Sequence, residues 1–226
     1  SGTVLERDNI PPIDKAFYVQ ARTEITPQFG IAAWYLRSVG DKTYTLRAAH
    51  DKGNDEQRFD HLADVIGLGA KWQVGKNTAL SVDYGVNRTE FGKYMNGHSI
   101  IAHTPRSAEF TPKGRQTGST PKFWTARLDI GMSDTDRPGT WNAFVDYKYF
   151  EHGAFFGGNG TESLPDRYLD GIKSFTIGGG YVPAQNWLVE LFYTFDAKGI
   201  NSRDTLHGPE KFRLGNYTRF QVTYKF

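Results

Sequence analysis

A strict alternation of apolar and polar residues limits the fold of this chain more than any other feature of its sequence. Side chains two residues apart point to the same face of a β-strand, so a period of two predicts a strand with one apolar and one polar face. We expect such a strand wherever the alternation is unbroken. It is clearest over residues 217–226, whose apolar set is Thr218, Phe220, Val222, Tyr224 and Phe226.

The same alternation recurs along most of the chain and predicts about ten strands in all. Each is long enough to cross about 25 Å of hydrocarbon at a tilt of about 40°. Three apolar residues, Phe144, Leu188 and Phe192, fall on the polar side as exceptions. Besides residues 217–226, the clear strands are 17–25, 66–74, 80–86, 124–130, 141–149, 175–181 and 187–195, with weaker ones at 29–36 and 43–49.

The connections between these strands differ in length. Short turns at one end and long loops at the other are typical of an outer-membrane β-barrel. No helical periodicity or linker divides the chain, so residues 1–226 are expected to form one domain. The expected turns are residues 74–77, 133–139 and 182–186, and the expected long loops are residues 91–121, 151–167 and 197–215.

Composition favours the same class. Among 226 residues, 15% are aromatic and 25 are Gly, whereas the hydrophobic share is only 38%, which favours an all-β chain over a helical or a disordered one. A net charge of +2 gives no support to a nucleic-acid partner, and the absence of Cys excludes disulfides and thiolate metal sites. No apolar stretch of about 18 residues is present, but membrane-spanning strands need only about 9 to 11 residues each.

A soluble β-sandwich is the main alternative, because its strands also alternate apolar and polar residues. Three features favour a membrane barrel over it. The predicted strands exceed the usual five or six residues, aromatic residues recur at strand ends, and the polar side carries both signs of charge. The fold class expected is therefore an all-β, antiparallel transmembrane β-barrel in a bacterial outer membrane, with lipid around it and no cofactor or metal.

The C-terminal ending and two further stretches of the sequence resemble known outer-membrane proteins. The ending Phe220, Val222, Tyr224, Phe226 resembles the C-terminal signature that the assembly machinery of bacterial outer-membrane barrels reads, so Tyr224 and Phe226 are the expected assembly signal. Residues 141–149 with 168–180, and 181–198, resemble the C-terminal barrel of the OmpM-type porins of diderm Firmicutes, which carry an S-layer-homology domain.

The resemblance implies a porin through which small hydrophilic solutes diffuse, and it implies a homotrimer. In that family an S-layer-homology domain and a coiled coil precede the barrel, and neither is visible in this sequence. Tethering to peptidoglycan is therefore not assigned to this chain.

The polar faces of the predicted strands carry many charges, and an unpaired charge in a dry lumen would cost several kcal/mol. Water inside the barrel is one solution, and inward glycines such as Gly67, Gly85 and Gly178 would leave room for it. The alternative is that the charges pair across strands and fill a narrow barrel. The expected pore-lining residues are Arg22, Glu24, Arg47, Lys71, Asp83, Arg127, Asp129, Asp146, Lys148, Glu190 and Arg219.

Ten strands are few for a diffusive pore, since about eight already fill with side chains and wide channels have about 16 to 18. Residues 1–14 resemble a polar loop that enters a strand. We therefore expect the chain to be the later part of a barrel of about 16 strands, with about six supplied by an N-terminal segment. The alternative function is a narrow structural or adhesive barrel, an envelope tether without an open pore.

Residues 91–121 are the expected selectivity element. They carry four basic residues, Lys93, Arg106, Lys113 and Arg115, against Glu109, so the excess is 4 − 1 = +3. Folded into the lumen, this loop would narrow the pore and favour anions. The alternative is a loop that stays outside and binds nothing, or contacts anionic lipopolysaccharide.

Catalytic sets are weak in this sequence. Asp60 and His61 are adjacent and so point to opposite faces of a strand, and Asp64 lies close by. Ser99 lies near His98 and His103, but no nucleophile motif or orienting acid accompanies it. The two His residues also lack a third metal ligand. No enzymatic activity is expected.

Overall fold

The computed structural model of the chain describes residues 15–39, 44–47, 56–59, 61–97, 99–104, 107–111, 119–151, 153–154, 171–205, 208–213 and 215–225. Within these ranges, strands dominate and every pairing between neighbouring strands is antiparallel. The expectation of an all-β antiparallel fold is confirmed.

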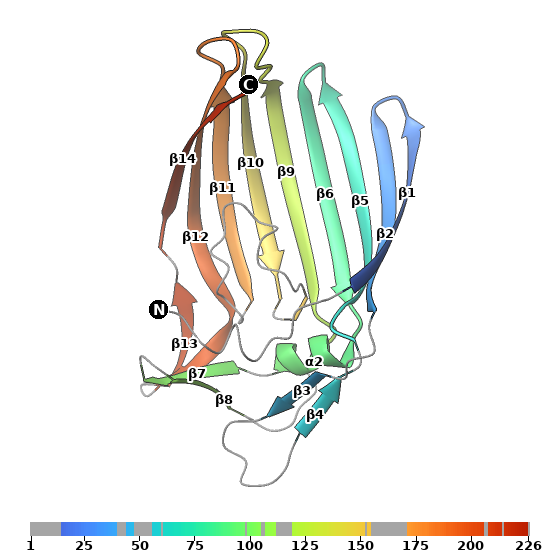
Figure 1. Cartoon of the computed structure of the whole chain (residues 1–226), viewed down its shortest axis with the longest axis vertical. Coiled ribbons are helices and arrows are strands. Elements are labelled where there is room, and N and C mark those ends of the chain that lie inside the picture. The colour runs from blue at the N-terminus through green and yellow to red at the C-terminus, as the bar shows by residue number, and fades with distance from the viewer. Residues whose placement is uncertain are drawn as a thin grey trace.

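One curved sheet of ten strands makes up most of the described structure (Figure 1). Its order is β1-β2-β5-β6-β9-β10-β11-β12-β13, with β14 also paired to β12. The strands are β1 (Lys15–Thr26), β2 (Phe29–Val39), β5 (Asp64–Gly75), β6 (Thr78–Asn87), β9 (Lys122–Met132), β10 (Trp141–Phe150), β11 (Ile172–Tyr181), β12 (Trp187–Thr205), β13 (Gly208–Arg213) and β14 (Tyr217–Tyr224).

The strands near the C-terminus differ from those expected from the sequence. β12 runs for 19 residues. Its first half pairs with β14 and its second half with β13, so these two strands lie end to end along one neighbour. The prediction of a long loop over residues 197–215 was therefore wrong, because most of that segment extends the last hairpin.

The prediction that residues 43–49 form a strand of the main sheet was also wrong. Its core, β3 (Tyr44–Arg47), pairs with β4 (Glu56–Phe59) in a separate two-stranded sheet. A second small sheet joins β7 (Ser99–Thr104) to β8 (Ser107–Thr111), and β7 contacts β12. These pairs lie within the long connections of the chain.

The two ends of the sheet differ as expected. The turns between β1 and β2, β5 and β6, β9 and β10, and β11 and β12 lie at the upper end of Figure 1, and the described strands of the long connections, β3, β4, β7 and β8, lie at the lower end. A helix of eight residues, α2 (Glu90–Gly97), also lies at the lower end. The sequence analysis did not predict it. The Thr89 side chain caps it, because its Oγ1 accepts a hydrogen bond of 2.9 Å from the Gly92 N–H.

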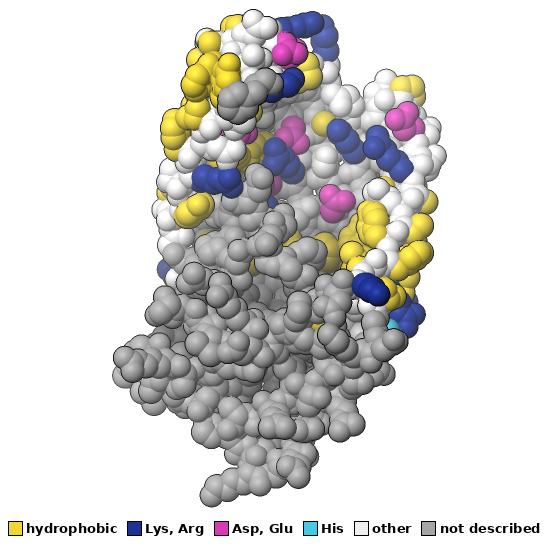
Figure 2. Space-filling model, viewed as in Figure 1, with side chains coloured by type: hydrophobic (Ala, Val, Ile, Leu, Met, Phe, Trp, Pro, Cys, Tyr) yellow, Lys and Arg dark blue, Asp and Glu magenta, His cyan; other side chains and the backbone are white. Residues whose placement is uncertain are grey.

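The strand register puts most of the apolar residues of the main strands on one face. Residues paired directly across an antiparallel sheet share a face. Among the described residues, the large hydrophobic side chains that are exposed all lie on this apolar face except Tyr18 and Tyr217. Figure 2 shows the opposite, hollowed face, where side chains of both charge signs gather.

Aromatic residues form two rows on the apolar face, separated by aliphatic residues. At the turn end, Trp141 is paired with Tyr181, and Trp187 with Tyr224. At the other end, the Tyr147 ring lies 4.8 Å from Trp124 and 4.7 Å from Phe175. The aliphatic residues between the rows include Leu68, Val82, Leu128, Val145, Ile177 and Leu191.

The sheet is open in the described structure. β1 pairs with β2 alone, and β14 pairs with β12 alone. Nothing therefore joins β1 to β14 among the described residues. None of the described helices is both long enough and apolar enough to span a membrane.

Candidate functional site on the concave face

The hollowed face of the main sheet, called here the concave face, carries ten of the residues that the sequence predicted to line a pore. The register places them on it in continuous rows, such as Glu24, Gly30, Lys71, Ser81, Arg127 and Asp146 from β1 to β10. Five are basic and five are acidic, so their charges cancel (5 − 5 = 0). The remaining predicted residue, Arg47, lies on β3 in a separate sheet, and its side chain is outside the described residues.

On β9 and β10 the charges pair with one another. Asp146 is only 4% exposed, and its Oδ2 lies 3.5 Å from Lys148 Nζ and 3.8 Å from Arg127 Nη1. Arg127 also contacts Asp129, through Nε and Oδ1 at 2.8 Å. Because a buried carboxylate is stable only with partners, these contacts fix the two strands against each other.

The three apolar exceptions of the sequence pattern lie on the concave face, and two of them form a ring pair. Phe144 and Phe192 have ring centroids 5.7 Å apart. The Arg127 guanidinium lies 3.7 Å from the Phe144 centroid, and that of Arg219 lies 5.9 Å from the Phe192 centroid. Each ring therefore makes a cation–π contact, and such a contact contributes about 0.5 to 2 kcal/mol.

The prediction that inward glycines leave open space was wrong at Gly67, Gly85 and Gly178, because neighbouring rings occupy the space over them. A Cβ added to Gly178 would lie 2.7 Å from the Phe144 ring and 2.8 Å from the Phe192 ring. At Gly67 it would lie 1.9 Å from Trp34, and at Gly85 2.5 Å from Phe123. The glycines therefore seat large rings from adjacent strands against the backbone.

A cluster of rings lies on the concave face at the end with the long connections. Phe123 stacks on Phe150 with centroids 5.4 Å apart, and Trp34 lies 6.1 Å from Phe123. Val65 and Ala154 are buried against them. These side chains therefore fill part of the space above the concave face at this end.

Asn87, fully buried at the end of β6, holds three connections together. Its Oδ1 accepts hydrogen bonds from the backbone N–H groups of Asp64 (3.1 Å) and Thr89 (3.3 Å). Its Nδ2 donates to the carbonyl oxygens of Leu62 and Gly153, both at 3.0 Å. The start of α2 is thereby fixed beside the connections that precede β5 and follow β10.

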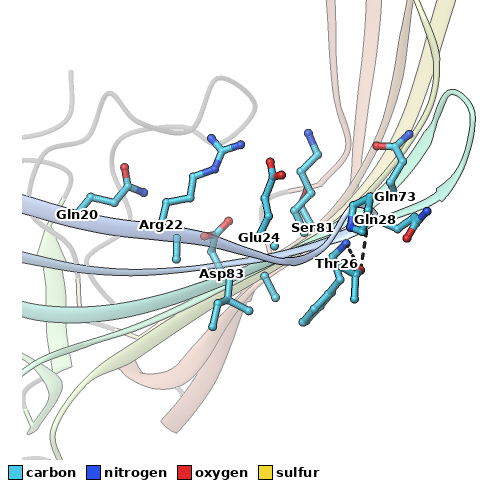
Figure 3. Close-up of a pocket in the computed structure, with 16 residues that line it drawn as sticks. Gln20, Arg22, Glu24, Thr26, Gln28, Gln73, Ser81 and Asp83 are labelled. Carbon is cyan, nitrogen blue, oxygen red and sulfur yellow. Dashed lines mark hydrogen bonds between the residues drawn. The ribbon is translucent and has the colours of Figure 1, made fainter.

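A hollow of about 410 Å³ lies over β1, β2, β5 and β6 on the same face (Figure 3). Gln20, Arg22, Glu24 and Asp83 project to the same side of the sheet around it. In contrast to β9 and β10, the ion pairs formed by described residues include none with Arg22, Glu24, Lys71 or Asp83. Water or a solute therefore has to solvate these charges.

The expected selectivity element is described only in part. Lys93 on α2 forms an ion pair of 2.8 Å with Glu90. Arg106, Lys113 and Arg115 lie outside the described residues. Of the expected assembly signal, Tyr224 contacts Trp187 with ring centroids 5.0 Å apart, and Phe226 lies outside the described residues.

Of the residues considered for catalysis, His61 and Asp64 have structural partners, whereas Asp60, His98 and the side chains of Ser99 and His103 lie outside the described residues. Both ring nitrogens of His61 are occupied, because Nδ1 lies 3.0 Å from the Ser38 carbonyl oxygen and Nε2 lies 3.0 Å from Arg37 Nη2. Asp64 accepts a 2.7 Å hydrogen bond from Arg88, which raises the pKa of Arg88. Within the described ranges, no three His, Asp or Glu side chains gather as a metal site.

No protein-family model matches the chain, and no curated protein matches it either.

Proposed function

We propose that this chain forms part of an outer-membrane porin, a water-filled channel for small hydrophilic solutes. The observation that carries the proposal is the apolar face, which is continuous across the whole main sheet while the opposite face is charged. Soluble monomers rarely expose an apolar patch larger than a few hundred Å². Lipid is the surrounding in which so wide an apolar face is stable.

The two aromatic rows also support the proposal that the apolar face contacts lipid. Tyr and Trp favour the boundary between hydrocarbon and headgroups, where the ring is apolar and its tip is hydrated. Trp141 and Tyr149 on β10 are eight residues apart, or about 27 Å at about 3.4 Å per residue. A tilt of about 40° reduces this to about 21 Å, comparable with the apolar band of an outer-membrane barrel.

The open sheet supports a barrel larger than this chain. A strand edge cannot face lipid, because each backbone N–H and C=O left unpaired there costs several kcal/mol. β1 and β14 each have an edge that is unpaired within the described ranges, and in lipid these edges need partners. We place about six further strands between them, which would complete a barrel of about 16 strands similar to the OmpM-type porins.

A narrow structural barrel is the second candidate. The rings seated over Gly67, Gly85 and Gly178 favour it, because they fill part of the concave face. A conductance measurement distinguishes the two functions. The protein isolated from the membrane should give stable open steps in a planar bilayer, whereas a silent barrel with intact β structure would favour the structural function.

Neighbouring residues on β6 allow a sharper test. Ser81 lies on the concave face and Val82 on the apolar face. Because the chain has no Cys, Ser81→Cys and Val82→Cys would each introduce a single thiol. A charged, water-soluble methanethiosulfonate should modify Ser81→Cys and lower the conductance, and should leave Val82→Cys unmodified. The reverse pattern would overturn the proposal.

Ion preference should depend on the segment 91–121. The ten charges of the concave face cancel, whereas that segment has an excess of basic residues. We expect the reversal potential in a salt gradient to show anion preference. Replacing Lys93, Arg106, Lys113 and Arg115 with Gln should abolish the preference. Clear cation preference of the unmodified protein would contradict this assignment.

A further inference from the structure

The hollow over β1, β2, β5 and β6 has a small-residue floor and charged walls. Gly30, Ala32 and Gly69 form its floor. Arg22 and Glu24 project from β1 on one side, and Lys71 on β5 and Asp83 on β6 line the other side. The small floor residues leave room between the two pairs of charges.

The register gives these four charges a crossed arrangement. One row runs Arg22, Ala32, Gly69, Asp83, and the next runs Glu24, Gly30, Lys71. A cation therefore faces an anion in both rows, and the two rows have opposite order. At about 4.8 Å between strands, the backbones of Arg22 and Asp83 are about 14 Å apart and those of Glu24 and Lys71 about 10 Å.

The position of Asp83 depends on Gly69. Asp83 Oδ1 lies 2.6 Å from the point that a Cβ on Gly69 would occupy, so the carboxylate leans over the floor towards β2. Gly69 thus brings the acid closer to Arg22. Even so, the ion pairs of the described residues include none between Arg22 and Asp83. The hollow of about 410 Å³ that both side chains line has room for a small solute.

We propose that this hollow binds small zwitterions, such as amino acids and short peptides. A solute carboxylate would bind Arg22 or Lys71, and its ammonium group would bind Glu24 or Asp83, by charge-assisted hydrogen bonds. A simple anion would be attracted by two of the four groups and repelled by the other two, whereas a zwitterion satisfies both kinds. Gln20, Gln73 and Ser81 add neutral hydrogen-bonding groups at the rim.

The proposal rests on the proposed function, because the concave face must be open to water. Glycylglycine is the zwitterionic probe, and N-acetylglycinamide is a neutral probe of similar size. In a planar bilayer, glycylglycine should cause a saturable reduction of the ion current, and the neutral probe should not. Titration calorimetry of the detergent-solubilised protein at low salt measures the same binding without an open channel.

Variants locate the site. Arg22→Gln and Asp83→Asn should each weaken glycylglycine binding by about tenfold, since a hydrogen bond to a charged group contributes about 1.5 kcal/mol or more. Glu190→Gln, which removes a concave-face charge on β12 outside the hollow, should leave binding unchanged. Equal binding of both probes, no binding, or binding insensitive to Arg22→Gln and Asp83→Asn would overturn the site. An absent ion current with intact calorimetric binding would instead overturn only the pore.

Discussion

Single glycines decide how side chains fill the concave face. Trp34, Phe123 and Phe144 project from neighbouring strands over Gly67, Gly85 and Gly178. A ring seated against bare backbone keeps its van der Waals contacts without pushing the strands apart. These three glycines are therefore packing positions, and the space that remains open lies over β1, β2, β5 and β6.

Gly67→Ala should destabilise the barrel by about 1 to 3 kcal/mol, the usual cost of an added methyl group in a packed site. Its Cβ would lie within 1.9 Å of the Trp34 ring, which is itself packed against Phe123. Urea unfolding in detergent micelles measures the change. Gly75→Ala is the matched control, because its Cβ would meet Thr78 at an ordinary 3.5 Å. Equal stability of both variants would contradict the packing role.

At the scale of elements, the connections at one end of the sheet are joined through one buried amide. Asn87 bonds to backbone groups of Leu62, Asp64, Thr89 and Gly153. Leu62, Thr89 and Gly153 belong to the connections before β5, after β6 and after β10, and Asp64 is the first residue of β5. The start of α2, at the lower end of the sheet, is therefore held in place by hydrogen bonds of Asn87, which lies outside the helix.

Asn87→Ala should cost about 2 to 4 kcal/mol, because it leaves buried backbone groups without partners. It should also make the segment that follows β6 accessible to protease while the main sheet stays folded. Limited proteolysis of the protein in vesicles, with urea unfolding alongside, measures both effects. Asn96→Ala is the control, since the hydrogen bonds of Asn96 to described residues are both to the exposed Ser119. Unchanged proteolysis of Asn87→Ala would exclude this anchoring role.

The two faces of the sheet should respond differently to the same charge. Leu68→Arg puts a guanidinium on the apolar face of β5, where lipid contact predicts a loss of about 2 to 4 kcal/mol. Ser81→Arg puts it on the concave face of β6, where water can solvate it. Urea unfolding from lipid vesicles compares the two variants. Equal tolerance of both would show that the apolar face does not contact lipid.

At the scale of the whole molecule, the sequence predicted what local alternation can determine. The faces of the strands, the apolar residues on them and the charged set from Arg22 to Arg219 follow from a period of two. The sequence did not predict that Tyr44–Arg47 pairs outside the main sheet, that β13 extends the last hairpin, or that rings cover Gly67, Gly85 and Gly178. Each of these depends on pairing between distant segments, which alternation does not encode. Thr89 and Glu90 were the available signals for α2, as a cap and a first-turn acid.

At the same scale, the proposed pore depends on whether the sheet closes into a barrel. The edges of β1 and β14, unpaired among the described residues, make this closure testable. A ring of only the described strands would bring these edges together, whereas the larger barrel separates them by about six strands. Because the chain has no Cys, a pair of introduced thiols reports the distance between edges. In membranes, Val19→Cys with Val222→Cys should resist a short bismaleimide. Val189→Cys with Val222→Cys, directly paired across β12 and β14, should be crosslinked and is the positive control. Crosslinking of the first pair within one chain would establish a small closed ring, and would favour the narrow structural barrel over the porin.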